Sequence, residues 1–568
     1  MGIEQLPPGW ILMLGALVVP LLRGRVKQAW MLLLPVAGLA QLVFLLPDGS
    51  AGVAASIFGY ELEIVRVDPL ARVWGTIFHI AAFLAVIYGL HVDDDVQHVA
   101  ALSYAGSAIG AVFAGDLITL FVYWELTAIT SVFLVWASRS ERSFKSGMRY
   151  LIMQVGSGVL LLTGVVLHVQ QTGSLAFTDF GGVSGPATAL IFLAMGIKAA
   201  FPLLHTWLED SYPEATITGT VWLSTFTTKL AIYALARGFP GEAMLIPIGA
   251  AMTAFPIFFA VIENDLRKVL AYSLNNQLGF MVVGIGIGTA AAINGTAAHA
   301  FAHILYKSLL FMSMGAVLFR AGTCNGSELG GLYKSMPWTC AFCIVGAASI
   351  SAFPFTSGFV SKSIILTESA AAHLPVVFLI LLFASAGVFH HSGIKIPYFA
   401  FFAHDSGIRV KEAPLNMLVA MGIAATLCIG IGVLPGPLYA LLPNQPVEFV
   451  PYTVPHVVTQ LQLLMWSALA FGVLNWYRIY PPELRSINLD FDWVYRRAAP
   501  AVFAVLTRWI AGLRAAVLGT AQRRIVGFVQ RVHRYHGPEG VLAQASGTGS
   551  MALGVVIVLS AILLLYFA

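Results

Sequence analysis

Long apolar runs alternate with short polar loops along almost the whole chain. About 20 apolar residues are the length that an α-helix needs to cross a bilayer, and lipid offers the backbone no hydrogen-bond partners, so a span must be a helix or a closed barrel. These runs are too long for barrel strands. We therefore predict about sixteen membrane-spanning helices, at 9–23, 29–46, 69–91, 97–114, 117–137, 147–170, 187–208, 215–237, 242–262, 267–289, 296–320, 338–366, 374–402, 414–434, 457–479 and 549–567.

Proline interrupts two of these runs. Lys198 stands four residues before Pro202, and Lys362 stands eight residues after Pro354. Proline in a span frees backbone groups that must then face protein or water. We expect both helices to be broken at these prolines.

Each interrupted run is followed by a span with its own lysine, Lys229 or Lys395. Two five-span units, 97–237 and 242–402, thus share one layout, and because five is odd the second unit enters the membrane upside down. This is the inverted-repeat plan of secondary transporters. The predicted fold is an all-α polytopic membrane protein with two inverted five-helix repeats that contain broken helices. The other predicted parts are N-terminal helices in 1–96, C-terminal helices in 403–480, a lateral helix in 481–546 and an anchor in 547–568.

The region before the last span is rich in arginine and contains no lysine. Leu506, Ile510, Leu513 and Val517 recur there at helical spacing. We predict a basic amphipathic helix from about 493 to 536, roughly 65 Å long at 1.5 Å per residue, that lies along the cytoplasmic face. The alternative is a loose segment attracted to anionic lipid.

Composition places the chain among membrane proteins. It is 58% hydrophobic and 10% charged, with a mean hydropathy of +0.83, which excludes a soluble domain. The segment MGIEQLPPGW has an acid and no base, so we expect no cleaved signal peptide and a retained first span. The four cysteines are too scattered for a disulfide scaffold, and Cys340 and Cys343 are expected to be packing residues rather than metal or redox ligands.

Basic residues gather in loops that lie on one side if every span crosses. They follow the first, fifth and ninth spans and recur near Arg320, Lys334 and Arg409. By the positive-inside bias these loops are cytoplasmic. We therefore expect a multi-pass protein of the bacterial inner membrane with its N-terminus outside. Two acidic loops, around 93–95 and 209–214, lie on the same predicted side.

Five of the ten lysines stand inside predicted spans: Lys198, Lys229, Lys307, Lys362 and Lys395. Each costs about 2.5 to 3.5 kcal/mol at mid-bilayer unless partners or water offset it. A membrane anchor gains nothing from that cost. A path for protons does, because a desolvated lysine takes up and releases a proton.

Other titratable residues extend this set. Glu125 lies in the middle of a span, and His299, His303 and Lys307 follow one another at four-residue steps, which places them on one helix face. Histidine titrates near neutral pH, so such a stripe is suited to relay protons. His205, just past the first break, is a further candidate.

Each of these residues has a plainer interpretation. Lys395 can snorkel to the interface, Glu125 and Lys198 can form a structural ion pair, and His205 can bond a freed carbonyl. His299 and His303 have the spacing of a helical zinc pair but lack the Glu of H-E-x-x-H and a third ligand.

Several long segments resemble known proteins: GDLITLFVYWELTAITS, GIKAAFPLLHTWLEDSYPEATITGTVWLSTFTTKLAIYALAR, DLRKVLAYSLNNQLGFM and HAFAHILYKSLLFMSMGAVLFRAG. They resemble the antiporter-like subunits of Mrp-type Na⁺/H⁺ antiporters, respiratory complex I and membrane-bound hydrogenases, and look most like the D-type subunits of Mrp antiporters. The resemblance implies that Glu125 pairs with Lys198, that Lys229, His303 and Lys307 continue a hydrophilic axis, and that Lys362 ends it. The 493–536 helix resembles the lateral helix of the distal complex I subunit.

We therefore predict a proton or Na⁺/H⁺ translocating subunit of a multisubunit membrane complex, with other membrane subunits, lipids, protons and Na⁺ as its partners and without nucleic acid. The alternatives are a subunit that pumps protons under the control of a redox or hydrogenase module, and a non-transporting scaffold. We expect no cofactor in this chain, because it has no glycine-rich phosphate loop and no cysteine cluster. Any oxidoreductase chemistry is expected in partner chains.

Overall fold

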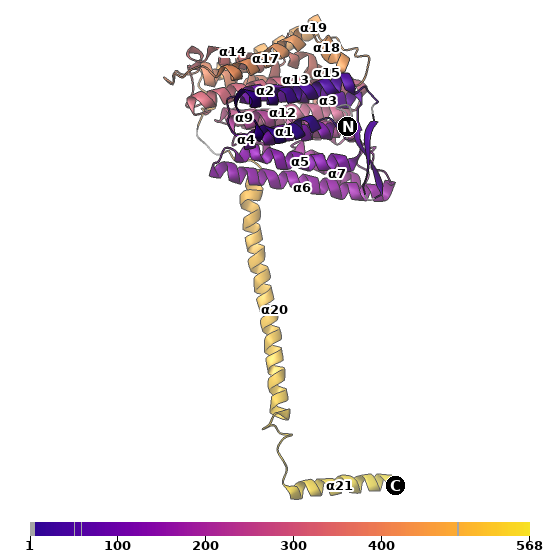
Figure 1. Ribbon diagram of the computed structural model, residues 1–568. Helices are drawn as coiled ribbons and strands as arrows, with labels where there is room; N and C mark the ends of the chain where they lie inside the picture. Colours follow the sequence, from indigo (N-terminus) through magenta and orange to yellow (C-terminus); the bar gives the residue numbers. More distant parts are fainter. Residues whose placement is uncertain (1–5, 50, 58, 485–487, 568) are drawn as a thin grey trace. The chain divides into compact units, whose positions relative to one another are not determined.

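The computed structural model describes residues 6–49, 51–57, 59–484 and 488–567. The chain forms two compact units, Met1–Asn488 and Leu489–Ala568. The first unit is a bundle of helices with one small β-hairpin (Figure 1). In the second, the described residues form three helices joined by short non-helical stretches.

Each predicted span in the first unit corresponds to one helix or to two successive helices, and in two of the spans the two helices are separated by a break. The N-terminal helices are α1 (Trp10–Val18) with η2 (Val19–Leu21), α2 (Gly24–Ala40) with η3 (Gln41–Leu45), and α3 (Pro69–Gly89). The C-terminal helices are α17 (Leu415–Val433), α18 (Gly436–Leu441) and α19 (Val454–Trp476). Between them lie two runs of helices with the same order.

The two runs match element by element. The first holds α4 (Asp95–Val112), α5 (Leu117–Trp136), α6 (Glu141–Thr172), the broken pair α7 (Pro186–Lys198) and α8 (Thr206–Ser211), and the pair α9 (Ile217–Thr225) and α10 (Thr227–Gly238). The second holds α11 (Leu245–Ile262), α12 (Leu266–Ile287), α13 (Ala290–Ala321), the broken pair α14 (Pro337–Ile350) and α15 (Ser357–Ala371), and α16 (Pro375–Val388) with η5 (Phe389–Lys395) and η6 (Tyr398–Phe402).

Small local features repeat at corresponding points of the two runs. Asp116 caps α5 and forms an isolated bridge with Ala176, while Asp265 caps α12 and forms one with Asn325. A capping aspartate satisfies free N–H groups at a helix start. Both runs thus use the same device before their second helix, which supports a repeat.

Both predicted breaks are confirmed. α7 ends at Lys198 and α14 at Ile350, four residues before Pro202 and Pro354 respectively. The main-chain hydrogen bonds are the same: Phe201 N donates to Gly196 O at 3.0 Å, and Phe353 N donates to Ala348 O at 3.0 Å.

Each break also contains two residues in the left-handed region. They are Ala200 (φ 62°) and Leu203 (φ 71°) in the first, and Ala352 (φ 56°) and Phe355 (φ 66°) in the second. This conformation is costly for residues other than glycine and persists where the surroundings impose it. The sequence predicted the breaks but not their identical geometry.

A two-stranded antiparallel hairpin, which the hydropathy pattern did not predict, connects α2 to α3. β1 (Ala51–Ile57) pairs with β2 (Tyr60–Arg66), with Ala51 opposite Arg66. Gly115 N donates to Glu63 O and Arg66 N donates to Phe113 O, so the hairpin is held on the turn between α4 and α5. Figure 1 shows it at one end of the helices. The predicted all-α fold is thus extended by this one hairpin.

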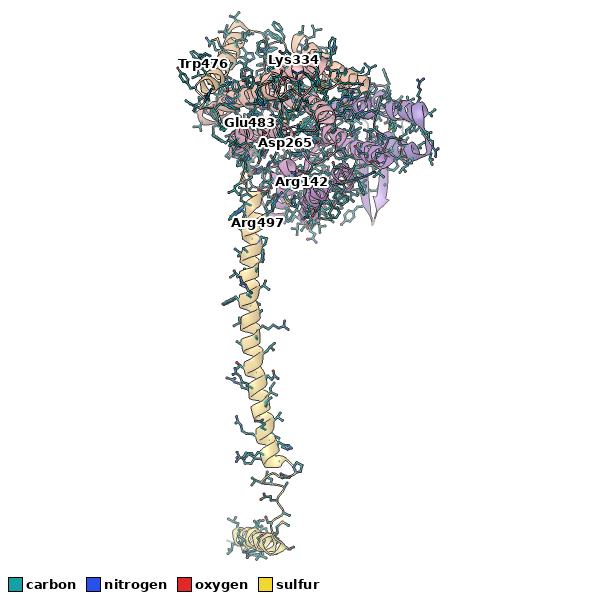
Figure 2. All side chains as sticks on the ribbon, turned by 90° about the vertical axis from the view of Figure 1, so that its left-hand side faces the viewer. Arg142, Asp265, Lys334, Trp476, Glu483 and Arg497 are labelled. Atoms are coloured by element: carbon teal, nitrogen blue, oxygen red, sulfur yellow. The ribbon has the colours of Figure 1, made fainter. Side chains whose placement is uncertain are left out.

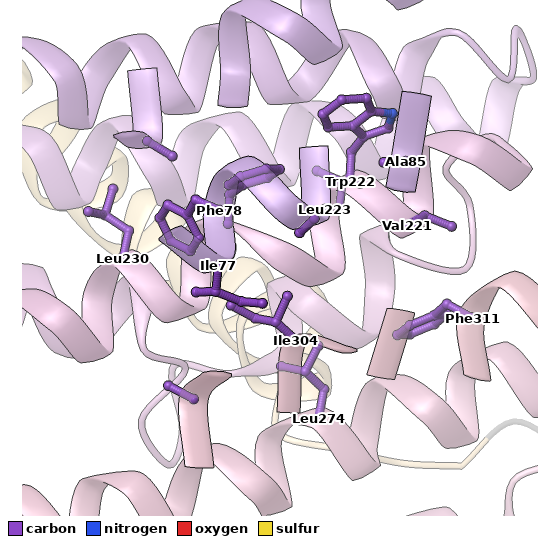
Figure 3. Packing of buried hydrophobic residues seen from close by; sticks show 14 of the residues in the cluster. Ile77, Phe78, Ala85, Val221, Trp222, Leu223, Leu230, Leu274, Ile304 and Phe311 are labelled. Carbon is purple, nitrogen blue, oxygen red and sulfur yellow. The ribbon is translucent and has the colours of Figure 1, made fainter. Parts of the chain in front are cut away.

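α13 lies at the centre of the bundle. It packs on α9, α12, α14, α15 and α17, and its side chains from Ala292 to Val317 are buried. Figure 3 shows Ile304 and Phe311 of α13 in the same core as Ile77 and Phe78 of α3 and Leu274 of α12. Because protein rather than lipid surrounds it, this helix can carry polar side chains through the membrane.

The loops that carry the basic clusters meet at one end of the bundle. Arg139 pairs with Asp94 at 3.1 Å, and Arg142 pairs with Glu214 at 2.5 Å. Arg267 donates to the carbonyl of Pro213 at 2.9 Å. Arg142, Asp265 and Lys334 are labelled in the view of this end (Figure 2). The acids of the two predicted acidic loops are therefore the partners of the neighbouring basic loops.

The second unit contains η7 (Val494–Ala498), α20 (Ala499–His536) and α21 (Thr548–Phe567). A long helix over the predicted 493–536 segment is thus confirmed. Its exposed apolar residues include Leu506, Ile510, Leu513 and Val517. Its placement along a cytoplasmic face stays a prediction.

Eleven helices in the described residues are long and apolar enough to cross a membrane, and three shorter apolar helices accompany them. α20 is among the eleven, although we expect it to lie on the membrane surface. The protein is therefore polytopic, and the exact number of crossings stays a prediction.

Candidate ion-translocation axis

Lys198 is the last residue of α7, and its side chain is fully buried. Its Nζ donates to the carbonyl oxygen of Trp124 at 2.5 Å and to Thr127 Oγ1 at 2.9 Å, and lies 4.5 Å from the Trp124 ring centroid. The ammonium therefore faces the turn of α5 that carries Glu125. It contacts the residues around Glu125 rather than forming the direct ion pair that the resemblance implied.

Glu125 is held by close packing on α6. A Cβ atom at Gly158 would lie 1.4 Å from Glu125 Oε1, so a larger residue there would displace the carboxylate from its present position. Glu125 Oε1 has no hydrogen-bond partner among the residues that the structure describes. A buried carboxylate oxygen without a partner is costly, so a shift of either side chain that forms the ion pair is favoured electrostatically.

Lys229 lies beside a discontinuity that the sequence analysis did not predict. α9 ends at Thr225 and α10 begins at Thr227, because the backbone of Phe226 (φ −96°, ψ −64°) departs from regular helical values. The irregularity frees the carbonyl of Ser224, which accepts a hydrogen bond from Lys229 Nζ. Lys198 and Lys229 thus both lie beside an interrupted helix.

His299, His303 and Lys307 all lie on α13, as their four-residue spacing predicted, and all three are fully buried. The ring centroids of His299 and His303 are 6.2 Å apart, and Tyr306 lies 5.2 Å from His303. Both ring nitrogens of His303 and the Nζ of Lys307 lack hydrogen-bond partners within the described part of the chain. Buried groups of this kind are normally satisfied by protein or ordered water.

Lys362 on α15 adjoins the same stripe. Its Nζ lies 5.0 Å from the centroid of the Phe280 ring, which is 6.1 Å from the ring of His299. The neighbouring Ser361 Oγ is 3.4 Å from His299 Nδ1. Lys362 and His299 are therefore adjacent on facing helices, which is the continuity that an ion path needs.

Lys395 does not snorkel to the surface. It is fully buried, its Nζ donates to Val261 O at 2.7 Å and Glu263 O at 2.6 Å, and it forms an ion pair with Glu483 at 3.0 Å. His205, 2% exposed, places its ring 4.5 Å from that of Phe255 on α11. It thus lies at the contact between the two helical runs.

Sequence reasoning missed several buried polar residues near the axis. Asn275, Asn276 and Gln277 of α12 are fully buried, and Gln277 accepts a hydrogen bond from the hydroxyl of Tyr306 at 3.1 Å. His391 is also fully buried, with Nδ1 2.9 Å from Ser392 Oγ. The consecutive polar letters of SLNNQ inside a predicted span were the available signal.

A cavity of about 380 Å³ opens near the N-terminal end of α13. It is lined by Asn294 of that helix, Glu368 near the end of α15 and Glu448 of the loop before α19, among others. Lys362 stands six residues before Glu368 on α15, so less than two helical turns separate Lys362 from the lining of the cavity.

Residues 114–389 match a family model described as NADH:quinone oxidoreductase/Mrp antiporter, TM. This range contains every residue of the axis from Glu125 to Lys362. We call the matched residues 114–389 the antiporter-like domain, because they are similar to this family model. The domain begins just before the cap of α5 and ends at the first residue of η5, so Lys395 lies beyond it.

Relatives of the antiporter-like domain occur in different assemblies. The chain is 26% identical to hydrogenase-4 component B of Escherichia coli K12 over 413 residues, covering 64% of this chain and 61% of that protein. It is 31% identical to the D-type Na⁺/H⁺ antiporter subunit of Alkalihalophilus pseudofirmus over 274 residues, covering 44% and 55%. The chain thus spans a little over half of the length of these two relatives.

A solved structure shows the same architecture. The Mrp complex from a Dietzia species matches with a TM-score of 0.75 and 25% identity over 98% of this chain and 62% of the matched chain. The resemblance stated from the sequence motifs is therefore confirmed.

Proposed function

We propose that this protein translocates protons, alone or in exchange for Na⁺, along a central axis of Glu125, Lys198, Lys229, His303, Lys307 and Lys362, with His205 and His299 beside it. The observation that carries the proposal is the burial of four axis lysines, each at most 1% exposed, in one bundle. None of these four forms an ion pair within 4 Å among the described residues, as a purely structural role would require.

The hydrogen-bond partners of the four lysines support stepwise proton transfer along this axis. Lys198 and Lys229 are bonded by carbonyls and a hydroxyl, which orient an ammonium without fixing its charge. Lys307 and Lys362 have no hydrogen-bond partner for Nζ in the described ranges. A charge held this weakly in a bundle interior is expected to attract water and to exchange its proton.

Glu125 controls the first step in this proposal. When its carboxylate approaches the ammonium of Lys198, the charged lysine is stabilised, and when the two separate the lysine releases its proton. The proton enters from the cytoplasm near Lys229 and His205, passes Lys198, His303 and Lys307, and leaves past Lys362. The cavity beside Glu368 lies on this exit route.

Orientation and domain organisation belong to the same proposal. The meeting of the basic loops at one end supports a cytoplasmic position for that end, an outside N-terminus and a bacterial inner membrane location. The parts 97–237 and 242–402 are the two inverted repeats. The α20 helix lies along the cytoplasmic face, where its arginines favour anionic lipid and partner subunits.

The chain is proposed to work with other membrane subunits of an Mrp-like or complex I-like assembly. Similarity to an Na⁺/H⁺ antiporter subunit favours exchange of Na⁺ for H⁺. Similarity to a hydrogenase component favours the alternative, proton pumping driven by a redox module in partner chains. A scaffold without transport is the third candidate.

Replacement of Glu125 by Ala tests the proposal. We expect loss of at least 90% of ion translocation in membrane vesicles, with normal amounts of assembled complex. Lys198→Met should give the same result, while Lys145→Met, which alters an exposed lysine paired with Glu141, should not. Unchanged transport in both axis variants would support the scaffold.

A further inference from the structure

The environment of Lys395 differs from that of the four axis lysines. Its Nζ donates to the carbonyls of Ala260, Val261 and Glu263 at 3.2, 2.7 and 2.6 Å. α11 ends at Ile262, so these oxygens belong to the C-terminal end of a helix, which attracts a cation. One side of the ammonium is thus held by backbone, and Glu483 occupies another.

Glu483 brings a buried carboxylate to this site from outside the antiporter-like domain. Its Oε1 lies 3.0 Å from Lys395 Nζ, and the two side chains are 5% and 0% exposed. It belongs to the non-helical segment after α19. In that segment Tyr480 stacks on His390, with centroids 5.4 Å apart and planes at 21°. The stacking fixes the segment against η5 and so positions the carboxylate.

A second acid near the site, Glu263, already has its own partners. Its Oε2 pairs with Lys268 at 3.0 Å, and its Oε1 accepts from the main-chain N of Asn264 at 3.0 Å. The counter-charge of Lys395 is therefore Glu483. The titratable and charged groups that act on Lys395 are Glu483, Glu263, His390 and His391. Behind the two acids, Lys268 pairs with Glu263 and Tyr480 interacts with Glu483.

Lys395 also has a connection toward the axis. His391 is one helical turn before it, and its Nδ1 lies 2.9 Å from Ser392 Oγ, which donates to Ser273 Oγ of α12 at 2.7 Å. Asn275 and Gln277 stand on the same helix, and Gln277 bonds Tyr306 of α13. Buried polar side chains thus continue from the histidine stripe to the lysine.

We propose that Glu483 is a positioning residue for ion transfer: it holds Lys395 as an ammonium at the basic end of the bundle, and so sets proton occupancy at that end. A carboxylate at this distance stabilises the charged lysine. When the segment carrying Glu483 moves away, Lys395 releases its proton toward His391 or to the water at the basic end of the bundle. This inference rests on the proposed function.

The test is Glu483→Gln in the complete complex, with ion translocation measured in vesicles across neutral and alkaline pH. Without its counter-charge Lys395 loses its proton more readily, so the pH profile should move down by about one unit or more. Glu483→Asp should keep the wild-type profile. Glu141→Gln, which breaks an exposed lysine pair, is the matched control and should leave the profile unchanged.

If Glu483 only tethers its segment to the bundle, Glu483→Gln would lower transport equally at every pH or leave it unaltered. Either result overturns the inference. If Glu483→Gln does not assemble, Lys395→Arg keeps the ion pair but cannot release its proton. That variant should assemble and lose transport, and full transport would refute the inference. The two proposals fail in different ways. If Glu125→Ala loses transport but Glu483→Gln leaves the pH profile unshifted, only the inference about Glu483 is rejected. If Glu125→Ala transports normally, the proposed function is rejected.

Discussion

The two broken helices share one backbone design but place their lysines differently. Lys198 is the last residue of α7, ahead of the break, whereas α14 ends at Ile350 and Lys362 follows within α15. The first ammonium bonds a carbonyl and a hydroxyl of a neighbouring helix, and the second has no hydrogen-bond partner among the described residues. The same backbone thus creates two unlike electrostatic sites.

For the lysines in the spans that follow the breaks, it is the second run, rather than the first, that gives the ammonium more hydrogen-bond partners. Lys229 of the first run bonds the carbonyl of Ser224, while Lys395 of the second has three carbonyls and a carboxylate. Within the second run, one lysine is almost unsupported and the other is fully supported. The contacts, rather than the presence of a lysine, therefore decide how firmly each site holds its charge.

Replacing these two lysines by methionine separates the two kinds of site and is expected to have the largest effect on stability. Lys395→Met leaves the buried Glu483 without its ion pair, which costs about 3–5 kcal/mol. Lys362→Met removes a buried charge that has little support, so the stability of the complex should stay equal or rise. Thermal unfolding of the purified complex measures both.

Transport should separate the variants further. Lys362→Met is expected to lose transport in a stable complex, since its ammonium is part of the path. The double variant Lys395→Met/Glu483→Gln should recover most of the stability lost in Lys395→Met, because no buried charge stays unpaired. Equal stability of Lys362→Met and Lys395→Met would contradict the distinction drawn here.

The site of Lys198 can be disturbed without touching a charge. In Gly158→Ala the added methyl group must displace the carboxylate of Glu125, because it would lie 1.4 Å from Oε1. We expect transport to fall by about tenfold, which corresponds to about 1.4 kcal/mol in the barrier to transfer. The measurement is the initial rate of translocation in vesicles, normalised to assembled complex.

Gly156 on the same helix is the matched control, because a Cβ atom there would meet open space within 4 Å. Gly156→Ala should transport at the wild-type rate. A Gly158→Ala variant that transports equally well would show that the position of the Glu125 carboxylate does not limit the rate.

Much of this arrangement follows from local patterns. Spans, proline breaks and the stripe of His299, His303 and Lys307 depend on hydropathy, on the missing N–H of proline and on helical periodicity, all of which act over short distances. The helices, both breaks and the position of the stripe on one helix are present in the structure, while the number of crossings and the role of the stripe stay predictions. The hairpin of β1 and β2 was missed, since its short strands become stable only by docking on the turn between α4 and α5.

Contacts between distant residues were not predictable in the same way. Nothing local indicates that Gly158 faces Glu125, or that Glu483 reaches Lys395 across 88 positions of the chain. The break at Phe226 also lacks a proline or glycine. In each case the cause is tertiary packing, which one sequence does not reveal.

The smallest expected effect comes from an exposed ion pair in the same half of the protein. Asp405 lies in the loop after η6, where Arg409 at 2.6 Å and Lys334 at 2.8 Å hold the pKa of its carboxyl below the usual range. For an acid with a lowered pKa, the stabilisation is present above the unfolded pKa and is lost as pH falls through the folded pKa. Asp405→Asn should therefore lower the unfolding temperature slightly at neutral pH, less in high salt, and not at all in strong acid. A decrease as large as that of Lys395→Met would show that burial does not separate the two pairs.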